Sequence, residues 1–73
     1  MLEMRVAMFA IRNKKTGKWV YGTDHRYNPH HQRTSDKRAL TFEDLDEAKH
    51  QFKMRQCGKD YEVVKVRLVE EAE

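Results

Sequence analysis

The chain has 73 residues, of which 38% are apolar and 37% charged, with one cysteine and one proline. This length fits a single domain spanning residues 1–73, and a domain of about this size buries only about 60% of the surface that its unfolded chain exposes. A lone cysteine cannot form an internal disulfide, which favours the reducing cytosol. No apolar run approaches the roughly 18 residues of a membrane span, and no signal-peptide pattern opens the sequence, so we expect no membrane partner.

Charge is divided unequally along the chain. Residues 1–38 carry nine Lys and Arg against three acidic residues, a net charge of +6, whereas residues 39–73 carry six against nine, a net charge of −3. A basic half attracts phosphate backbones, and it equally attracts acidic protein surfaces. We therefore expect one basic and one acidic face, the alternative being a solvated surface that only maintains solubility.

The first third of the sequence predicts an antiparallel hairpin. Residues 4–12 lack Gly, Pro and Asn and place apolar side chains on both sides of an alternation, which is typical of a central strand. The polar, Gly-containing run 13–18 predicts a short turn. Residues 19–23 are rich in strand formers, and Gly22 within them indicates a bulge or a close backbone approach.

The segment 24–38 is unlike the rest of the chain. It holds the only proline and three of the four histidines, and it has no aliphatic side chain. A polar stretch of about 15 residues without secondary structure is unusual in a compact domain and is typically functional or disordered. We predict a long polar loop here and regard it as the first place to look for a site.

The second half predicts a short strand, a helix and a final strand. Residues 39–42 favour the strand, and the spacing of Asp44 and Glu47 is that of a capping box at the start of a helix. We expect this helix to end after Cys57, with Gly58 as its left-handed cap. The residues predicted to line its core-facing stripe are Leu45, Ala48, Phe52 and Gln56.

Residues 61–69 predict the closing strand, and residues 70–73 a frayed acidic tail. The predicted order is β-β-β-α-β, which is an α+β fold with a small antiparallel sheet and one helix packed across it. The opposite side of the helix carries His50, Met54 and Cys57 at helical spacing. We expect this outer stripe either to bind a partner or to be covered by the polar loop.

The sequence contains no motif of a known catalytic site. It lacks G-x-S-x-G, H-E-x-x-H and a Walker loop, and its three glycines do not cluster. A core this small offers no enclosed cleft in which a reaction could be desolvated. We therefore expect a protein that is not an enzyme.

Zinc is the one cofactor that the histidines and the cysteine could bind, because a tetrahedral site needs four N or S ligands. No C-x-x-C or H-x-x-x-H spacing is present, and His50 and Cys57 are about 10.5 Å apart along a helix, too far to share an ion. The alternative is loop histidines facing water and a half-buried cysteine. The candidate ligands are His25, His30, His31 and Cys57.

Two charged groups are candidate partner-binding surfaces. Aromatic side chains interleaved with cations grip single-stranded nucleic acid, and Arg, Tyr and Trp also dominate the energetics of protein interfaces. The basic, aromatic group comprises Lys14, Lys15, Trp19, Arg26, Tyr27, Arg33, Lys37 and Arg38. The acidic group at the predicted helix start comprises Glu43, Asp44, Asp46 and Glu47.

The stretches FAIRNKKTGKWVYGTDHRY (residues 9–27) and QCGKDYEVVKV (residues 56–66) resemble small accessory proteins of phages and prophages of Gram-positive bacteria. Among these, the type II anti-CRISPR proteins, which inhibit Cas9, are similar in size and charge. The resemblance implies an anti-defence protein of the bacterial host cytosol that docks without catalysis on Cas9, or on a similar host nucleoprotein, and blocks nucleic-acid loading. It would act as a monomer or small homo-oligomer.

The alternative is a small nucleic-acid-binding protein that uses the basic N-terminal half, with or without a structural zinc. Such a protein would bind single strands with an affinity that falls steeply with salt.

Overall fold

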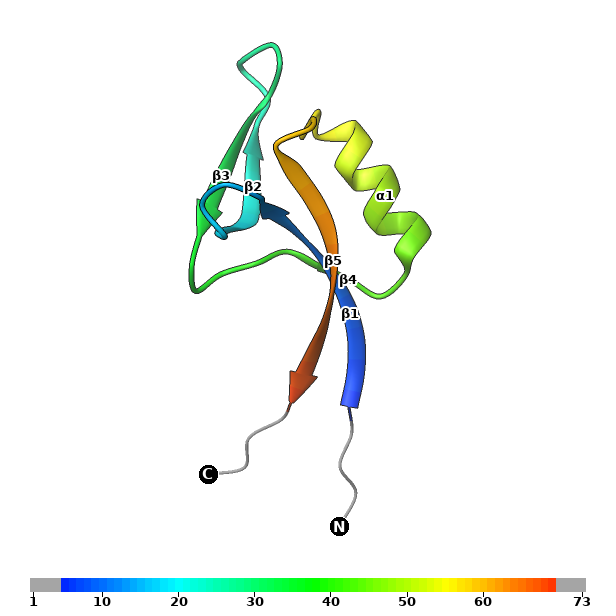
Figure 1. The fold of residues 1–73 in the computed structure, drawn as a ribbon. Coiled ribbons are helices and arrows are strands. Elements are labelled where there is room, and N and C mark those ends of the chain that lie inside the picture. The colour runs from blue at the N-terminus through cyan, green and yellow to red at the C-terminus, as the bar shows by residue number, and fades with distance from the viewer. Residues whose placement is uncertain (1–4, 70–73) are drawn as a thin grey trace.

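The computed structural model describes residues 5–69, and it places one helix against an antiparallel sheet (Figure 1). The predicted α+β class is therefore confirmed. The predicted tail at 70–73 lies outside the described residues. The elements in chain order are β1 (Arg5–Asn13), β2 (Trp19–Asp24), β3 (His31–Ser35), β4 (Thr41–Phe42), α1 (Leu45–Met54) and β5 (Tyr61–Val69).

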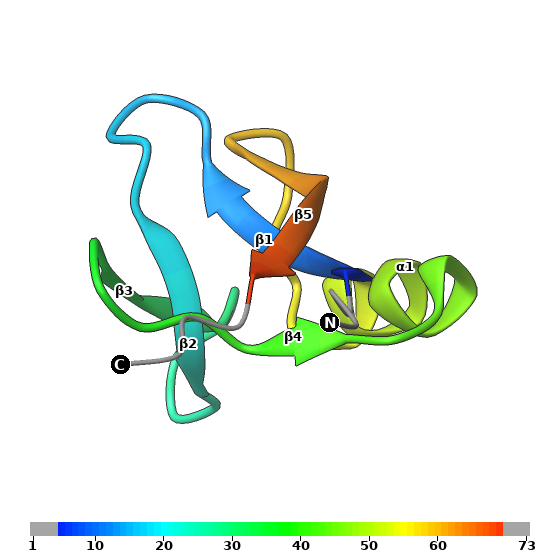
Figure 2. The same cartoon turned by 90° about the horizontal axis from the view of Figure 1, so that it is seen from below.

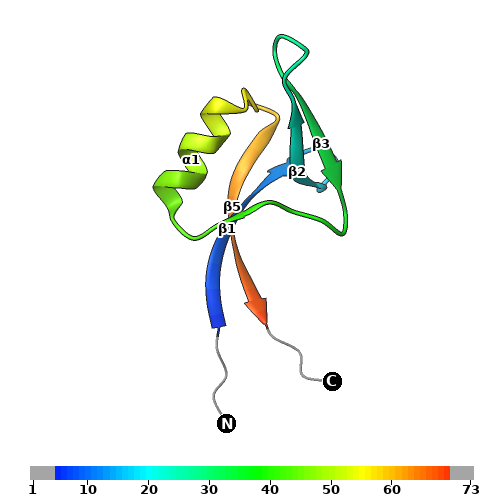
Figure 3. The same cartoon turned by 180° about the vertical axis from the view of Figure 1, so that it is seen from behind.

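Strand β1 is the centre of the sheet, as predicted. It pairs with β5 along its full length, from Arg5 opposite Val69 to Asn13 opposite Tyr61. Its other edge pairs with β4 in the middle and with β2 at the end, where Arg12 lies opposite Trp19. The long β1–β5 ribbon lies between α1 on one side and the β2–β3 hairpin on the other (Figures 1 and 3).

The segment 24–38 is not the long loop that its composition predicts. Residues His31–Ser35 form β3, which pairs with β2 from Trp19↔Ser35 to Asp24↔His31, and a bulge between Val20 and Gly22 adjusts the register. The prediction was wrong because it relied on aliphatic content. An edge strand needs only backbone pairing on one side, and this one has polar side chains that bond to the rest of the fold.

The predicted third strand is shorter than expected. Of residues 39–42, only Thr41 and Phe42 form a strand, and they pair with Ala10 and Phe9 of β1. The backbone N–H of Leu40 instead donates to the carbonyl of Val20, 3.0 Å away. The chain therefore crosses from the hairpin to α1 in a largely irregular path along the sheet.

Helix α1 begins where its capping signal predicts, since the Asp44 carboxylate accepts a hydrogen bond from the backbone N–H of Asp46. It ends earlier than expected, at Met54. The Gln56 N–H donates to the carbonyl of Lys53, and the Cys57 N–H to that of Phe52, which is the Schellman arrangement. Gln56, with φ of 54°, takes the left-handed position that the sequence assigned to Gly58.

The core is small and lies between α1 and the sheet. Its centre is Ile11, Val20 and Cys57, and the side chains packed around it are Phe42, Phe52, Tyr61 and Val63. Ala48, on the inner side of α1, is fully buried.

The predicted core stripe of the helix is right for Ala48 and Phe52, whereas Leu45 is 39% exposed and Gln56 is exposed as well. The predicted outer stripe does not form one surface. The helix ends before Cys57, and the Cys57 side chain lies in the core after the Schellman turn. His50 and Met54 remain on the surface. Within the described residues, no helix has the length and apolar character that a membrane crossing requires.

Candidate functional site

The outward side of the β2–β3 hairpin gathers several of the predicted binding residues on one surface. Side chains of a strand alternate between two faces. Val20 is buried against the core, while the pairing register puts Trp19, Asp24, His31 and Arg33 on the opposite side of the ribbon. We define the Tyr–Arg face as the surface formed by Tyr21, Asp24, Arg26, Tyr27, His31, Arg33 and Arg38.

Asp24 is the electrostatic centre of the Tyr–Arg face. Its carboxylate accepts hydrogen bonds from the backbone N–H of Arg26 at 3.1 Å and from the Arg26 guanidinium at 2.7 Å. A guanidinium nitrogen of Arg33 lies 3.9 Å from the same carboxylate. The side-chain hydrogen bond from Arg26 is the main reason that the pKa of Asp24 falls well below its ordinary value. Hydrogen bonds therefore orient Arg26 before any partner arrives, and Arg33 lies within ion-pair distance of the same carboxylate.

An exposed aromatic stack lies beside these charges. The rings of Tyr27 and His31 are almost parallel, at 5° to each other, with centroids 4.0 Å apart. The Arg26 guanidinium lies 5.9 Å from the centre of the Tyr27 ring, within the range of a cation–π contact. Tyr27 is 47% exposed, so this stack presents a large aromatic surface to solvent.

A second cation–π pair extends the face along β2. The guanidinium of Arg38 lies 5.0 Å from the centre of the Tyr21 ring. Arg38 comes from the segment after β3, so this segment folds back against β2. The face thus carries three arginines against the single carboxylate of Asp24.

The end of α1 fixes the tip of the hairpin. The Gln56 side-chain carbonyl accepts from the His30 backbone N–H at 3.1 Å. Arg55 donates to the Thr23 hydroxyl at 2.9 Å, and the Gln32 side chain donates to the backbone carbonyl of Arg55. These contacts use the inner side of the hairpin, and they leave the Tyr–Arg face free on the outer side.

A shallow groove of about 200 Å³ adjoins the Tyr–Arg face. Ala10 and Val66 of the β1–β5 ribbon contribute to its apolar lining, together with Trp19. The segment after β3 supplies the charged side chains of Asp36, Lys37 and Arg38. Arg38 therefore borders the groove and also covers Tyr21, so the two features form one continuous surface.

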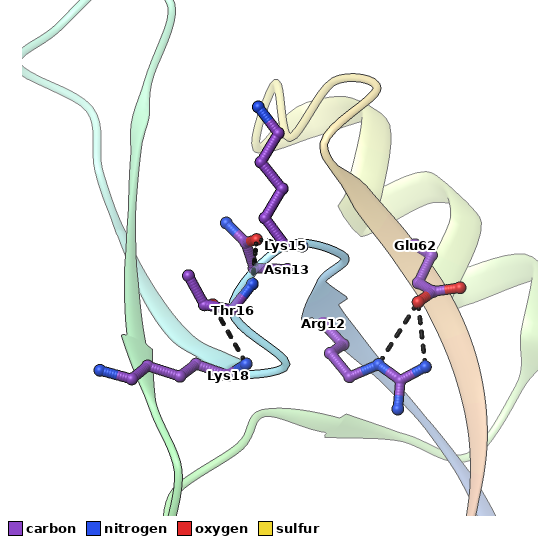
Figure 4. A network of polar contacts seen from close by, with 6 residues as sticks. All are labelled: Arg12, Asn13, Lys15, Thr16, Lys18 and Glu62. Atoms are coloured by element: carbon purple, nitrogen blue, oxygen red, sulfur yellow. Dashed lines mark hydrogen bonds and ion pairs between the residues drawn. The ribbon is translucent and has the colours of Figure 1, made fainter.

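The other predicted basic residues lie elsewhere. Lys14 and Lys15 belong to the β1–β2 turn, at the opposite end of β2 from the hairpin tip, and the ammonium of Lys15 lies 3.7 Å from the Asp60 carboxylate. Figure 4 shows the turn, in which the Asn13 side chain accepts from the backbone N–H of Lys15 at 2.8 Å. Trp19 is half-buried, and the Arg12 guanidinium lies over it, 5.6 Å from the centre of the Trp19 ring.

The predicted acidic group lies across the molecule from the Tyr–Arg face. All of its members are exposed at or just before the first turn of α1. The view from below shows α1 and the β2–β3 hairpin on opposite sides of the β1–β5 ribbon (Figure 2). The acidic group and the Tyr–Arg face are thus separate surfaces, while Lys14 and Lys15 of the predicted basic group lie in neither. The members are Glu43, Asp44, Asp46 and Glu47.

The candidate zinc ligands are not brought together. His25 and His30 are neighbours, with ring centroids 4.6 Å apart, but His31 stacks on Tyr27 and Cys57 lies in the core. Burial raises the pKa of the Cys57 thiol to about 11, so it is protonated at neutral pH and is a poor metal ligand. Among residues 5–69, no three His, Cys, Asp or Glu side chains are grouped so as to hold a metal ion.

Sequence reasoning left Tyr21, Asp24 and His31 out of the binding group. Once β3 is recognised as a strand, the alternation of side chains along the hairpin places His31 and Arg33 opposite Asp24 and Gly22. The signal that was available is the DxR spacing of Asp24 and Arg26, which permits a local carboxylate–guanidinium pair.

A scan of protein-family models finds no match to this chain, and searches of the curated proteins and of the solved structures find none.

Proposed function

We propose that this chain is a non-catalytic binding protein that docks on a host nucleoprotein of the Cas9 kind through the Tyr–Arg face. The observation that carries the proposal is the hydrogen-bonded Asp24–Arg26 pair with Arg33 within ion-pair distance of Asp24, beside the exposed stack of Tyr27 on His31. Arginine and tyrosine held in place on a surface are the residues that contribute most to protein interfaces, because little side-chain entropy is lost when the partner binds.

The charges of the two faces support a nucleoprotein as the partner. A nucleoprotein presents both phosphates and the basic protein surface that holds them. The three arginines of the Tyr–Arg face suit the former, and the exposed acidic group at the start of α1 suits the latter. Cas9 is the candidate that follows from the resemblance of residues 9–27 and 56–66 to phage accessory proteins, and a protein seated on its nucleic-acid channel would block loading.

The test is direct binding between the purified chain and purified Cas9, with and without guide RNA, followed by a DNA-cleavage assay. We expect a stable complex and reduced cleavage. Replacing Tyr27 or Arg33 by alanine should weaken the complex at least tenfold, since interface hot spots exceed about 1–2 kcal/mol each. The matched control is Lys49→Ala, which removes one exposed positive charge from α1 on the other side of the molecule. Absence of a complex at micromolar concentrations contradicts the proposal.

Binding of single-stranded nucleic acid alone is the second candidate function. It is favoured by the exposed Tyr27–His31 stack, because aromatic rings next to arginines form stacking platforms for bases. It predicts a mobility shift of a short oligonucleotide at low salt that is lost as salt rises. If no shift is seen with RNA or DNA at low salt, this candidate is wrong.

A further inference from the structure

The groove beside the Tyr–Arg face is small enough to suit a single ring. Its volume of about 200 Å³ is below the roughly 300–1,000 Å³ of ordinary small-molecule sites. Ala10, which is 1% exposed, together with Val66 and Trp19 gives it an apolar, partly aromatic lining. A small occupant gains from leaving water here only if the part that it buries is weakly polar.

The border of the groove adds a charge requirement. Lys37 and Arg38 follow one another along the chain and are both exposed, and Asp36 precedes them. Two adjacent cations suit an occupant that carries anionic groups next to its ring. A nucleotide in a single strand meets this requirement, because its base is flanked by phosphates, whereas an aromatic side chain of a protein brings no anion of its own.

We propose that the groove receives one base of a single-stranded RNA, with the adjoining phosphates on Lys37 and Arg38. Asp36 lies at the border of the groove, where its carboxylate can accept a hydrogen bond from a ribose 2′-hydroxyl, a donor that DNA lacks. The strand continues from the groove past Tyr21, which Arg38 covers, toward the rest of the Tyr–Arg face. This inference rests on the proposed function, since a nucleoprotein brings RNA to that face.

Trp19 is the only tryptophan of the chain, so its fluorescence reports directly on the groove. The probe is an eight-nucleotide oligoadenylate RNA, titrated at low salt into the full chain, with the DNA of the same sequence as a second arm. We expect RNA to quench Trp19 fluorescence with an affinity that matches a gel shift measured in parallel. DNA should bind several-fold more weakly.

Three variants localise the effect. Ala39 is exposed and lines the groove, so Ala39→Leu fills it without disturbing the core and should weaken RNA binding at least fivefold. Lys37→Ala should reduce the slope of log affinity against log salt by about 0.7, the value for one phosphate contact on a single strand. Lys49→Ala is the charge-matched control on α1 and should leave the slope nearly unchanged.

Circular dichroism of each variant confirms that it is folded before its affinity is compared. If RNA binds by gel shift but leaves Trp19 fluorescence unchanged and tolerates Ala39→Leu, the base lies elsewhere and the assignment is wrong. DNA binding as tightly as RNA would contradict the role of Asp36. If no RNA binds, the groove assignment fails by itself, while the Cas9 binding assay still decides the proposed function separately.

Discussion

Asp24→Asn separates docking on a nucleoprotein surface from simple capture of nucleic acid. The substitution keeps the size of the side chain and removes the carboxylate that lies 2.7 Å from Arg26 and 3.9 Å from Arg33. Arg26 then loses the carboxylate to which it donates, and Arg33 loses its ion-pair partner. The Tyr–Arg face keeps its three arginines without an opposing carboxylate, so its positive charge rises by one.

The two functions respond to this change in opposite directions. A protein partner must now order two free arginines on binding, which costs roughly 2- to 12-fold in affinity for each, or roughly 5- to 150-fold for both. Free single strands instead gain from the extra positive charge, and their salt slope becomes steeper by about 0.7. Titration calorimetry with the Cas9–guide complex, and gel shifts with RNA at several salt concentrations, measure the two effects.

We expect Asp24→Asn to weaken the Cas9 complex and to strengthen binding of free RNA. A variant that changes neither affinity would refute the reasoning, because it would mean that Arg26 and Arg33 touch no partner. Stronger binding both to the Cas9–guide complex and to free RNA would mean that the Tyr–Arg face contacts only the nucleic acid of the complex. The control is Asp60→Asn, which removes a carboxylate paired with Lys15 at the β1–β2 turn, away from the hairpin tip.

Three further predictions concern the fold that supports this face. Ile11→Ala removes one of the two largest fully buried side chains and should lower the free energy of unfolding by about 2–5 kcal/mol in urea titrations, and a loss below 1 kcal/mol would contradict the core assignment. Gln56→Gly relieves the left-handed backbone but loses the bond to the His30 N–H, so we expect stability within about 1 kcal/mol of wild type and faster hydrogen exchange at His30. Cys57 should react with a maleimide at pH 7–8 only when the chain opens locally or unfolds, because its thiol is buried in the core, where burial also raises its pKa to about 11; rapid labelling of the folded chain would contradict its position.

The sequence was most informative where local signals and tertiary packing agree. The β1–β2 turn, the Asp44 cap and the last strand follow from turn residues, a capping side chain and β-branched content, and the structure has all three. These features depend on neighbours in the chain, which a sequence pattern records directly.

The failures occurred where long-range polar contacts decide the structure. Strand β3 has no aliphatic side chain, and Gln32 and Thr23 of the hairpin are tied to Arg55 at the end of α1, more than 20 residues away. Gln56 occupies the left-handed position expected of Gly58, and its side chain bonds to the hairpin tip. Because β3 was missed, the pairing that brings His31 and Arg33 beside Asp24 was missed too.

The most direct test of the Tyr–Arg face is the affinity of a double variant, Tyr27→Ala with Arg33→Ala, for the Cas9–guide complex. Both side chains are exposed, so the fold should persist, which a thermal melt verifies. We expect the double variant to bind at least roughly a hundredfold more weakly than wild type, since each residue is an interface hot spot. Lys49→Ala should bind within about threefold of wild type. Equal affinity of the double variant and wild type would contradict the assignment of this face as the contact surface.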